Sequence, residues 1–262
     1  MGVGVGRTRV PLRSTYFGVL LLLYFPIALL FLFSFSENTV LNFPLRGFSL
    51  DWYREVFEDA SLIEAARNSV VVGVVAATLA TLIGFAVSVA VICFRFRGRA
   101  GLVALAGLPL IVPFIVLGVS LFLLFIFVDI QRSLATIAIG HTVVAVPFAT
   151  LILLARMIGL DPNLEDAAMD LGATYRTTLW RVVVPLMGAS LLSAWLTCFI
   201  VSFDEVAIAL FLAGGDPTFP IYLYGQLRFA QRLPVLIAMA VLLMIGTVTL
   251  TLVAFRLGRR RA

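Results

Sequence analysis

Six long apolar runs constrain the fold of this chain more than any other feature. They cover about residues 15–35, 69–93, 101–127, 135–155, 186–212 and 234–257. A hydrocarbon core about 30 Å thick is crossed by roughly 20 residues of helix, so each run is long enough to span a bilayer. The chain is 62% hydrophobic and only 13% charged, unlike a soluble domain. We therefore expect one all-α domain over residues 1–262, a polytopic membrane protein with six transmembrane helices.

Two of the runs contain residues that disturb a helix. The third run carries Gly107, Pro109, Pro113 and Gly118, and the fourth run carries Pro147. Proline removes one backbone hydrogen bond, which neighbouring helices can compensate within a bundle. We therefore expect both spans to be bent or locally unwound.

The distribution of arginine predicts the orientation of the spans. All nineteen basic residues are arginine. With a cytoplasmic N-terminus, the cytoplasmic segments hold thirteen of them: Arg7, Arg9, Arg13, Arg95, Arg97, Arg99, Arg156, Arg176, Arg181, Arg256, Arg259, Arg260 and Arg261. The opposite side holds six: Arg46, Arg54, Arg67, Arg132, Arg228 and Arg232. This bias follows the positive-inside rule and predicts that both termini are cytoplasmic, with the basic tail against lipid headgroups rather than nucleic acid.

Several kinds of chemistry find no support in the sequence. A P-loop needs a lysine and the chain has none, so we expect no ATP and no other cofactor on this chain. Cys93 and Cys198 lie inside apolar runs and have no metal-ligand spacing, which predicts no metal site. His141 is the only histidine, and pairing it with Ser120 as an intramembrane protease would still leave the rest of a catalytic constellation missing. We therefore expect that the chain is not an enzyme.

The segment Leu50–Ser69, LDWYREVFEDASLIEAARNS, lies in the first external loop. Trp52 or Tyr53, Val56 or Phe57, and then Ala60 recur at helical spacing, which indicates an amphipathic helix. The acids that would face water are Glu55, Glu58, Asp59 and Glu64. Two interpretations stay open, namely a helix at the membrane interface and a docking surface for an external partner.

A polar segment interrupts the apolar chain between the fourth and fifth runs, on the predicted cytoplasmic side. Asp161 and Pro162 are typical of a helix start, and Glu165 and Asp166 suit the positive end of its dipole. We expect this helix to run to about Leu171.

An apolar stripe follows this segment. Leu164, Ala168, Leu171 and Tyr175 recur at three- to four-residue spacing, and Gly172 interrupts the pattern. A second short helix is expected from Tyr175 to Val183, before Pro185 opens the fifth span. Either a soluble protein grips this surface, or the helices fold back onto the cytoplasmic face of the protein itself.

The same segment carries a recognisable motif. Asp166-Ala167-Ala168 is followed after three residues by Gly172, and after nine more by Val182-x-Val184-Pro185. This spacing resembles the EAA loop of permease subunits of bacterial ATP-driven (ABC) importers. Aspartate replaces the glutamate of the consensus at Asp166, which leaves open whether Glu165 assists, and valines replace isoleucine and leucine at 182 and 184.

The resemblance implies a MetI-like permease fold in the bacterial inner membrane. In that family the loop, here residues 161–184, forms coupling helices seated in a separate ATPase, where ATP and Mg²⁺ bind. The resemblance therefore implies two ATPase subunits, a second similar permease and an external solute-binding protein as partners. The implied coupling residues are Glu165, Asp166, Ala167, Ala168, Leu171, Gly172, Val182 and Pro185.

Three further segments resemble permeases of the spermidine and putrescine importers: Ser202–Arg228, Phe48–Phe57 and Asn68–Gly73. Together these segments reach over most of the chain from Phe48 to Arg228. The resemblance implies a polyamine or another small cationic solute as cargo. Permeases for iron, opines and amino-acid-like solutes share much of this pattern, so those cargoes stay as alternatives.

Asp204 and Glu205 are adjacent acids inside the fifth run. A carboxylate facing lipid is costly, so we expect the pair to face the bundle, a water-filled cavity or a cation, with Trp195, Phe199 and Phe203 adding aromatic faces. Adjacent helical residues point about 100° apart, so at most one of the two acids should face the pathway squarely. In the alternative interpretation the acids reach headgroup water or pair with Arg228 or Arg232. An ion-gradient-driven secondary transporter would use the same acids, although no clear internal repeat supports it.

Overall fold

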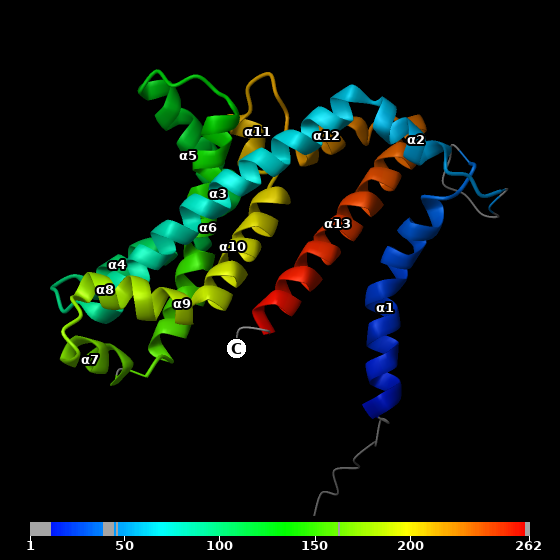
Figure 1. Ribbon diagram of the computed structural model, residues 1–262. Coiled ribbons are helices and arrows are strands. Elements are labelled where there is room, and N and C mark those ends of the chain that lie inside the picture. The colour runs from blue at the N-terminus through cyan, green and yellow to red at the C-terminus, as the bar shows by residue number, and fades with distance from the viewer. Residues whose placement is uncertain (1–11, 39–44, 46, 162, 260–262) are drawn as a thin grey trace, which may run out of the picture. The chain divides into compact units, whose positions relative to one another are not determined.

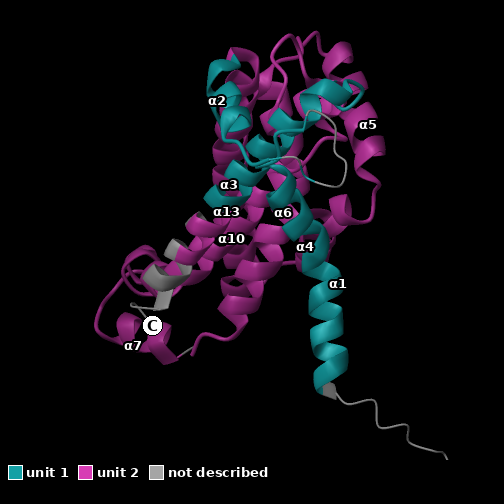
Figure 2. Ribbon diagram, turned by 90° about the vertical axis from the view of Figure 1, so that its right-hand side faces the viewer, with its two compact units in different colours: residues 1–59, 226–246 teal, residues 60–225, 247–262 magenta. Residues whose placement is uncertain are grey.

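The computed structural model describes residues 12–38, 45, 47–161 and 163–259. Pro162, expected at the first helical position, lies outside them, as does the end of the basic tail. The chain divides into two compact units, residues 1–59 with 226–246 and residues 60–225 with 247–262 (Figure 2). The described residues are almost entirely helical, and their only β-structure is an isolated bridge between Ser36 and Phe48.

The first unit contains α1 (Leu12–Phe33), α2 (Asp51–Glu58) and η3 (Ala230–Arg232), and α13 (Leu233–Arg259) begins in it. Within this unit the Trp52 indole donates to the carbonyl of Ser36 at 2.6 Å, and the Tyr53 hydroxyl lies 2.7 Å from Ser34 Oγ. Arg232 pairs with Glu55 at 3.4 Å and also with Asp59. The amphipathic helix is thus held by polar contacts within the first unit.

The second unit is built on three helices, α3 (Ala60–Cys93), α6 (Leu134–Ile158) and α10 (Gly188–Phe203) (Figure 1). Small residues let these backbones approach closely. A Cβ added at Gly84 of α3 would lie 2.7 Å from the Cβ of Ala149 on α6. Ala77, Ala80, Ala145, Ala149 and Ala194 are completely buried between the helices. Interdigitated small side chains therefore form the core.

The third apolar run is sharply bent, as its prolines predict. It forms α4 (Arg99–Gly107), the short η1 (Leu108–Leu110) and α5 (Phe114–Phe127), with 103° between the two halves. Pro109 and Pro113 flank the bend. The fourth run behaves differently, because α6 continues through Pro147. The local unwinding expected at Pro147 was therefore wrong.

The polar segment forms α7 (Asn163–Asp170), α8 (Tyr175–Thr178), a wide turn of π-helix η2 (Leu179–Val183) and α9 (Val184–Leu186). The second short helix is longer than expected, because Pro185 lies inside it and the chain bends by 69° at Met187 before α10. The fifth run also ends early: α10 stops at Phe203, and α11 (Ala209–Leu212) and α12 (Phe219–Gln226) follow.

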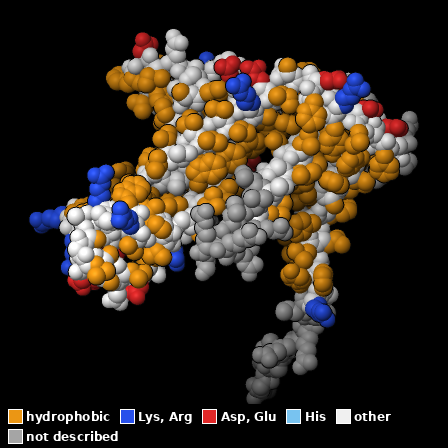
Figure 3. Space-filling view, in the orientation of Figure 1, with side chains coloured by type: hydrophobic (Ala, Val, Ile, Leu, Met, Phe, Trp, Pro, Cys, Tyr) orange, Lys and Arg blue, Asp and Glu red, His pale blue; other side chains and the backbone are white. Residues whose placement is uncertain are grey.

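The described helices provide four spans that are long and apolar enough to cross a membrane, α1, α3, α6 and α13, or six if each bent pair counts as one. Apolar side chains cover the helices, whereas charged side chains gather at the helix ends (Figure 3). Leu22 is 72% exposed and Phe127 is 87% exposed. Large exposed apolar side chains are expected in a protein that is embedded in a lipid membrane.

Candidate functional site

The short helix α7 ends in a motif that requires glycine. Gly172 has a positive φ of 85°, which side chains with a Cβ adopt only with strain. The Ala173 N–H donates to the Ala168 carbonyl at 3.1 Å, and the Gly172 N–H donates to the Met169 carbonyl at 2.9 Å. These two bonds form a Schellman cap, which satisfies carbonyls at the end of the helix. Gly172 thus sets the angle at which the chain leaves α7.

The surface of α7 is open. No residue of this helix is buried, Leu164 and Met169 are each more than 40% exposed, and the adjoining Leu171 is 91% exposed. Asp166 and Ala167 are also exposed, while Glu165 and Ala168 are half-buried. A helix folded back onto its own protein would bury its leucines. The exposed side chains instead favour the interpretation in which another protein covers this surface.

The second half of the polar segment is packed into the protein. The rings of Tyr175 and Phe94 meet edge to face with centroids 5.4 Å apart, next to the end of α3. Val183 and Met187 are buried in the core formed by α3, α6 and α10. Val182 is half-buried and Pro185 is exposed. The segment therefore joins an exposed helix to the helices of the bundle through one continuous packed stretch.

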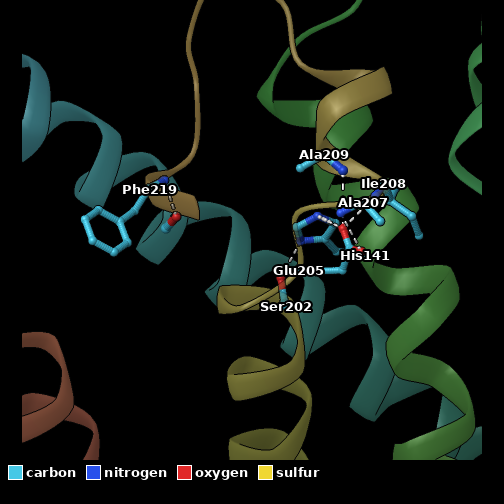
Figure 4. Close-up of polar contacts among 8 residues, drawn as sticks. His141, Ser202, Glu205, Ala207, Ile208, Ala209 and Phe219 are labelled. Atoms are coloured by element: carbon cyan, nitrogen blue, oxygen red, sulfur yellow. Dashed lines mark hydrogen bonds and ion pairs between the residues drawn. The ribbon is translucent and has the colours of Figure 1, made fainter. Parts of the chain in front are cut away.

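Glu205 is turned into the protein. Its side chain is 4% exposed and accepts hydrogen bonds from the backbone N–H groups of Ala207 at 2.9 Å, Ile208 at 2.8 Å and Ala209 at 3.3 Å (Figure 4). These donors lie in the turn before α11 and at its first residue, where backbone N–H groups have no partner within the helix. Glu205 thus caps a short helix and is not free to receive a cation.

His141 of α6 joins Glu205 to α10. Its Nδ1 lies 2.8 Å from Ser202 Oγ, and its Nε2 lies 3.5 Å from Glu205 Oε2. His141 is 1% exposed and Ser202 is 3% exposed, so no substrate reaches this serine. Ser120 bonds to the Val116 carbonyl of its own helix and not to His141. Ser202, His141 and Glu205 are the residue types of a hydrolase triad. Here they are buried and link α6 to α10 and to the segment that follows α10.

Asp204 has the opposite environment, although it is the next residue along the chain. It caps the C-terminal end of α10 and its side chain is exposed. No described residue of the second unit forms an ion pair with its carboxylate. The acid pair therefore provides one free carboxylate, that of Asp204.

A row of aromatic rings along α10 leads to Asp204. Trp195 and Phe199 are stacked with centroids 5.5 Å apart, Phe203 follows at 5.8 Å, and Phe219 lies 6.5 Å from Phe203. We call these four rings the aromatic row. Trp195, Phe199 and Phe203 are spaced by four residues and so share one face of the helix. Their rings are half-buried.

The sequence did not reveal two parts of this site. The contacts of His141 with Ser202 and Glu205 join residues 61 and 64 positions apart, and Phe219 joins the row across the break between α10 and α12. The available signal was the single histidine within an apolar run, because a buried imidazole needs hydrogen-bond partners. This signal does not show which residues form hydrogen bonds with His141.

The geometry defines a class, a polytopic helical membrane protein with an open polar segment at one end and a free acid beside aromatic rings. Solved ABC importers share the fold. An inward-facing MetNI methionine transporter matches with a TM-score of 0.67 at 19% identity, over 77% of this chain and 96% of the other. The bacterial alginate transporter in complex with an alginate pentasaccharide-bound periplasmic protein matches with a TM-score of 0.73 at 16% identity, over 95% and 92%.

Residues 80–262 match the family described as binding-protein-dependent transport system inner membrane component, and the chain belongs to this family of ABC importer permeases. The chain is 34% identical over 208 residues to the spermidine/putrescine transport system permease protein PotC of Haemophilus influenzae, covering 79% of this chain and 80% of the relative. It is 30% identical over 230 residues to the putrescine transport system permease protein PotI of Escherichia coli K12, covering 85% and 81%. The chain is thus a transport subunit and not an enzyme, as its sequence predicts.

Proposed function

We propose that this permease carries polyamines or closely similar organic cations, and that Asp204 contacts the cargo. The observation that carries the proposal is the free carboxylate of Asp204 at the end of the aromatic row, while Glu205 is used as a helix cap. An ammonium group is attracted both by a carboxylate and by the faces of aromatic rings. The similarity to the polyamine permeases PotC and PotI supports the same class of cargo.

The segment 161–184 is proposed to seat in a separate ATPase subunit, where ATP and Mg²⁺ bind. The exposed leucines of α7 support this part, because the opposite end of the same segment is packed into the bundle. Movement of an ATPase against α7 would then reach α10 through the bend at Met187. We propose that the residues inferred from the motif take part in this coupling.

The complete importer is proposed to contain two ATPase subunits, a second similar permease and an external solute-binding protein, in a bacterial inner membrane with both termini of this chain cytoplasmic. The family description supports the membrane and the binding protein, and the alginate complex provides an example of such a partner. The arginine distribution supports the orientation.

Uptake of radiolabelled spermidine into proteoliposomes that contain the full importer tests the cargo site. Asp204→Asn keeps the shape of the side chain but removes its charge, so we expect uptake to fall about tenfold. Asp216→Asn is the matched control, because Asp216 is an exposed acid in the loop after α11, and its uptake should stay at the wild-type rate. Equal uptake by the Asp204→Asn variant and the wild type would remove Asp204 from the pathway.

The alternative cargoes are separated by competition in the same vesicles. Unlabelled putrescine and spermidine should inhibit uptake, whereas ferric iron, opines and amino acids should not. If spermidine uptake is inhibited only by one of the non-polyamine solutes, that solute would replace the polyamines as the assigned cargo.

The energy source is tested in the same vesicles. A pH gradient without ATP should drive no uptake, whereas it would drive uptake by an ion-coupled secondary transporter.

A further inference from the structure

Two segments that resemble polyamine permeases touch each other in the structure. Asn68 Nδ2 of α3 donates to the Pro217 carbonyl at 3.1 Å, and Ser69 Oγ accepts from the Phe219 N–H at 2.8 Å. Figure 4 shows the second contact beside Phe219. Asn68 is 8% exposed, Ser69 2% and Phe219 7%. We call these four residues the α3 latch.

The latch supplies hydrogen-bond partners for backbone groups of the segment after α11. The first N–H groups of a helix have no acceptor within that helix, and Phe219 begins α12. Its N–H is buried, so leaving it without an acceptor would cost free energy. Ser69 provides the acceptor from a helix 150 residues away in sequence. The segment from Pro217 to Phe219 is therefore held in place by α3.

Helix α3 also contacts the aromatic row further along its length. A Cβ at Gly73 would lie 2.9 Å from Cε2 of Phe199, so glycine leaves room for this ring. The Trp195 indole donates to Thr78 Oγ1 at 3.0 Å. Ser69, Gly73 and Thr78 thus meet the row at Phe219, Phe199 and Trp195 in order. Helix α3 therefore sets the positions of three rings of the aromatic row.

We propose that cations approach Asp204 through a passage beside the aromatic row, and that the α3 latch sets the width of this passage by holding Phe219 against Phe203 at the end of the row. Phe203 immediately precedes Asp204 in the chain, and Phe219 lies against Phe203. A passage bounded by a fixed ring accepts a slender cation and discriminates between cations of different length or bulk. Asn68 and Ser69 are positioning residues, and this role rests on the proposed function.

The first measurement tests whether the latch holds its segment, without any substrate. Thr218 is 2% exposed between Pro217 and Phe219, so Thr218→Cys, made with Cys93→Ala and Cys198→Ala, reports opening through its rate of modification by a water-soluble methanethiosulfonate reagent. In the full importer we expect Ser69→Ala to raise this rate about tenfold, because it removes a buried acceptor. Ser69→Thr keeps the hydroxyl and should leave the rate within about twofold. Equal rates in all three proteins would overturn the latch.

The second measurement tests whether the latch acts on the passage. The ratio of spermidine to putrescine uptake should change about threefold or more in Ser69→Ala, and stay near the wild-type ratio in Ser69→Thr. Ser193→Ala is the control, an exposed serine of α10 outside the row. Loss of folded protein alone would lower both uptakes in proportion.

The outcomes separate the two proposals. An unchanged ratio in a Ser69→Ala importer whose thiol rate has risen would overturn the role in selectivity and leave the latch as a structural contact. Failure of the wild-type importer to move either polyamine would overturn the proposed function, while the thiol measurement would still decide whether the latch exists.

Discussion

At the scale of single residues, the adjacent acids show how environment assigns different roles to similar side chains. Neighbouring residues at the end of a helix point about 100° apart, so one carboxylate can face inward while the next faces out. Glu205 meets three backbone N–H groups, and Asp204 pairs with no described cation of the second unit. The sequence predicted that at most one acid would face the pathway. The choice between them depended on the start of α11, which no local pattern revealed.

The cap formed by Glu205 predicts a difference in stability between the neighbours. Glu205→Ala leaves three backbone N–H groups at and before the start of α11 without their acceptor, so the free energy of unfolding should fall by about 1–3 kcal/mol. Asp204→Ala is the matched control and should change it by less than about 0.5 kcal/mol. Thermal unfolding of the purified chain in detergent measures both. An equal loss in the two variants would mean that Glu205 does not act as a cap.

The positive φ of Gly172 makes a second prediction at this scale. Gly172→Ala forces a Cβ into the left-handed region at a cost of about 1–2 kcal/mol, which changes how α7 joins α8. We expect ATP-dependent uptake to fall several-fold while membrane insertion stays normal, as measured in proteoliposomes with equal protein content. Gly101→Ala is the control, since Gly101 lies in α4 with open space around it and no positive φ. Wild-type uptake by Gly172→Ala would contradict a role for this cap in coupling.

At the scale of elements, apolar length and proline position predicted most of the helices. The third run bends where Pro109 and Pro113 interrupt its hydrogen bonds. Pro147 does not unwind α6, because a helix tightly packed on α3 and α10 keeps its other hydrogen bonds. The early end of the fifth run was also missed, since Val206–Leu212 is apolar enough to continue a span. Tertiary contacts at Glu205 decided that boundary.

The exposed end of α7 makes a prediction about a partner. Leu171 is 91% exposed, so Leu171→Asp should not destabilise this chain but should place a charge where an ATPase is proposed to dock. We expect the amount of ATPase that co-purifies with the permease to fall about tenfold or more, as seen by quantitative gel densitometry. Leu171→Met keeps an apolar side chain of similar volume and should retain the ATPase. Undiminished co-purification with Leu171→Asp would favour a surface that no ATPase covers.

At the scale of the whole molecule, the function depends on which end of the bundle faces which compartment. In the second unit, the chain places α7 at one end of the helices and α11 with the start of α12 at the other (Figure 1). The sequence predicts this separation, because the polar segment precedes the fifth apolar run and the loop after Leu212 follows it. Charge bias then predicts that α7 lies in the cytoplasm. Neither pattern shows which side chains meet at the far end, where residues from α3, α6, α10 and α12 assemble the site.

Single cysteines can test the predicted orientation in intact cells. Leu171 and Asp216 are both exposed and lie on the two sides of α10, so Leu171→Cys and Asp216→Cys, each made with Cys93→Ala and Cys198→Ala, report opposite compartments. A membrane-impermeant maleimide should label Asp216→Cys in intact spheroplasts, and it should label Leu171→Cys only after lysis. The segments predicted to be cytoplasmic hold thirteen arginines against six in the others, so the reverse insertion is expected to be costly. Labelling of Leu171→Cys from outside would place α7 beyond the reach of a cytoplasmic ATPase, and would overturn the orientation together with the coupling role, while the family and the fold would remain.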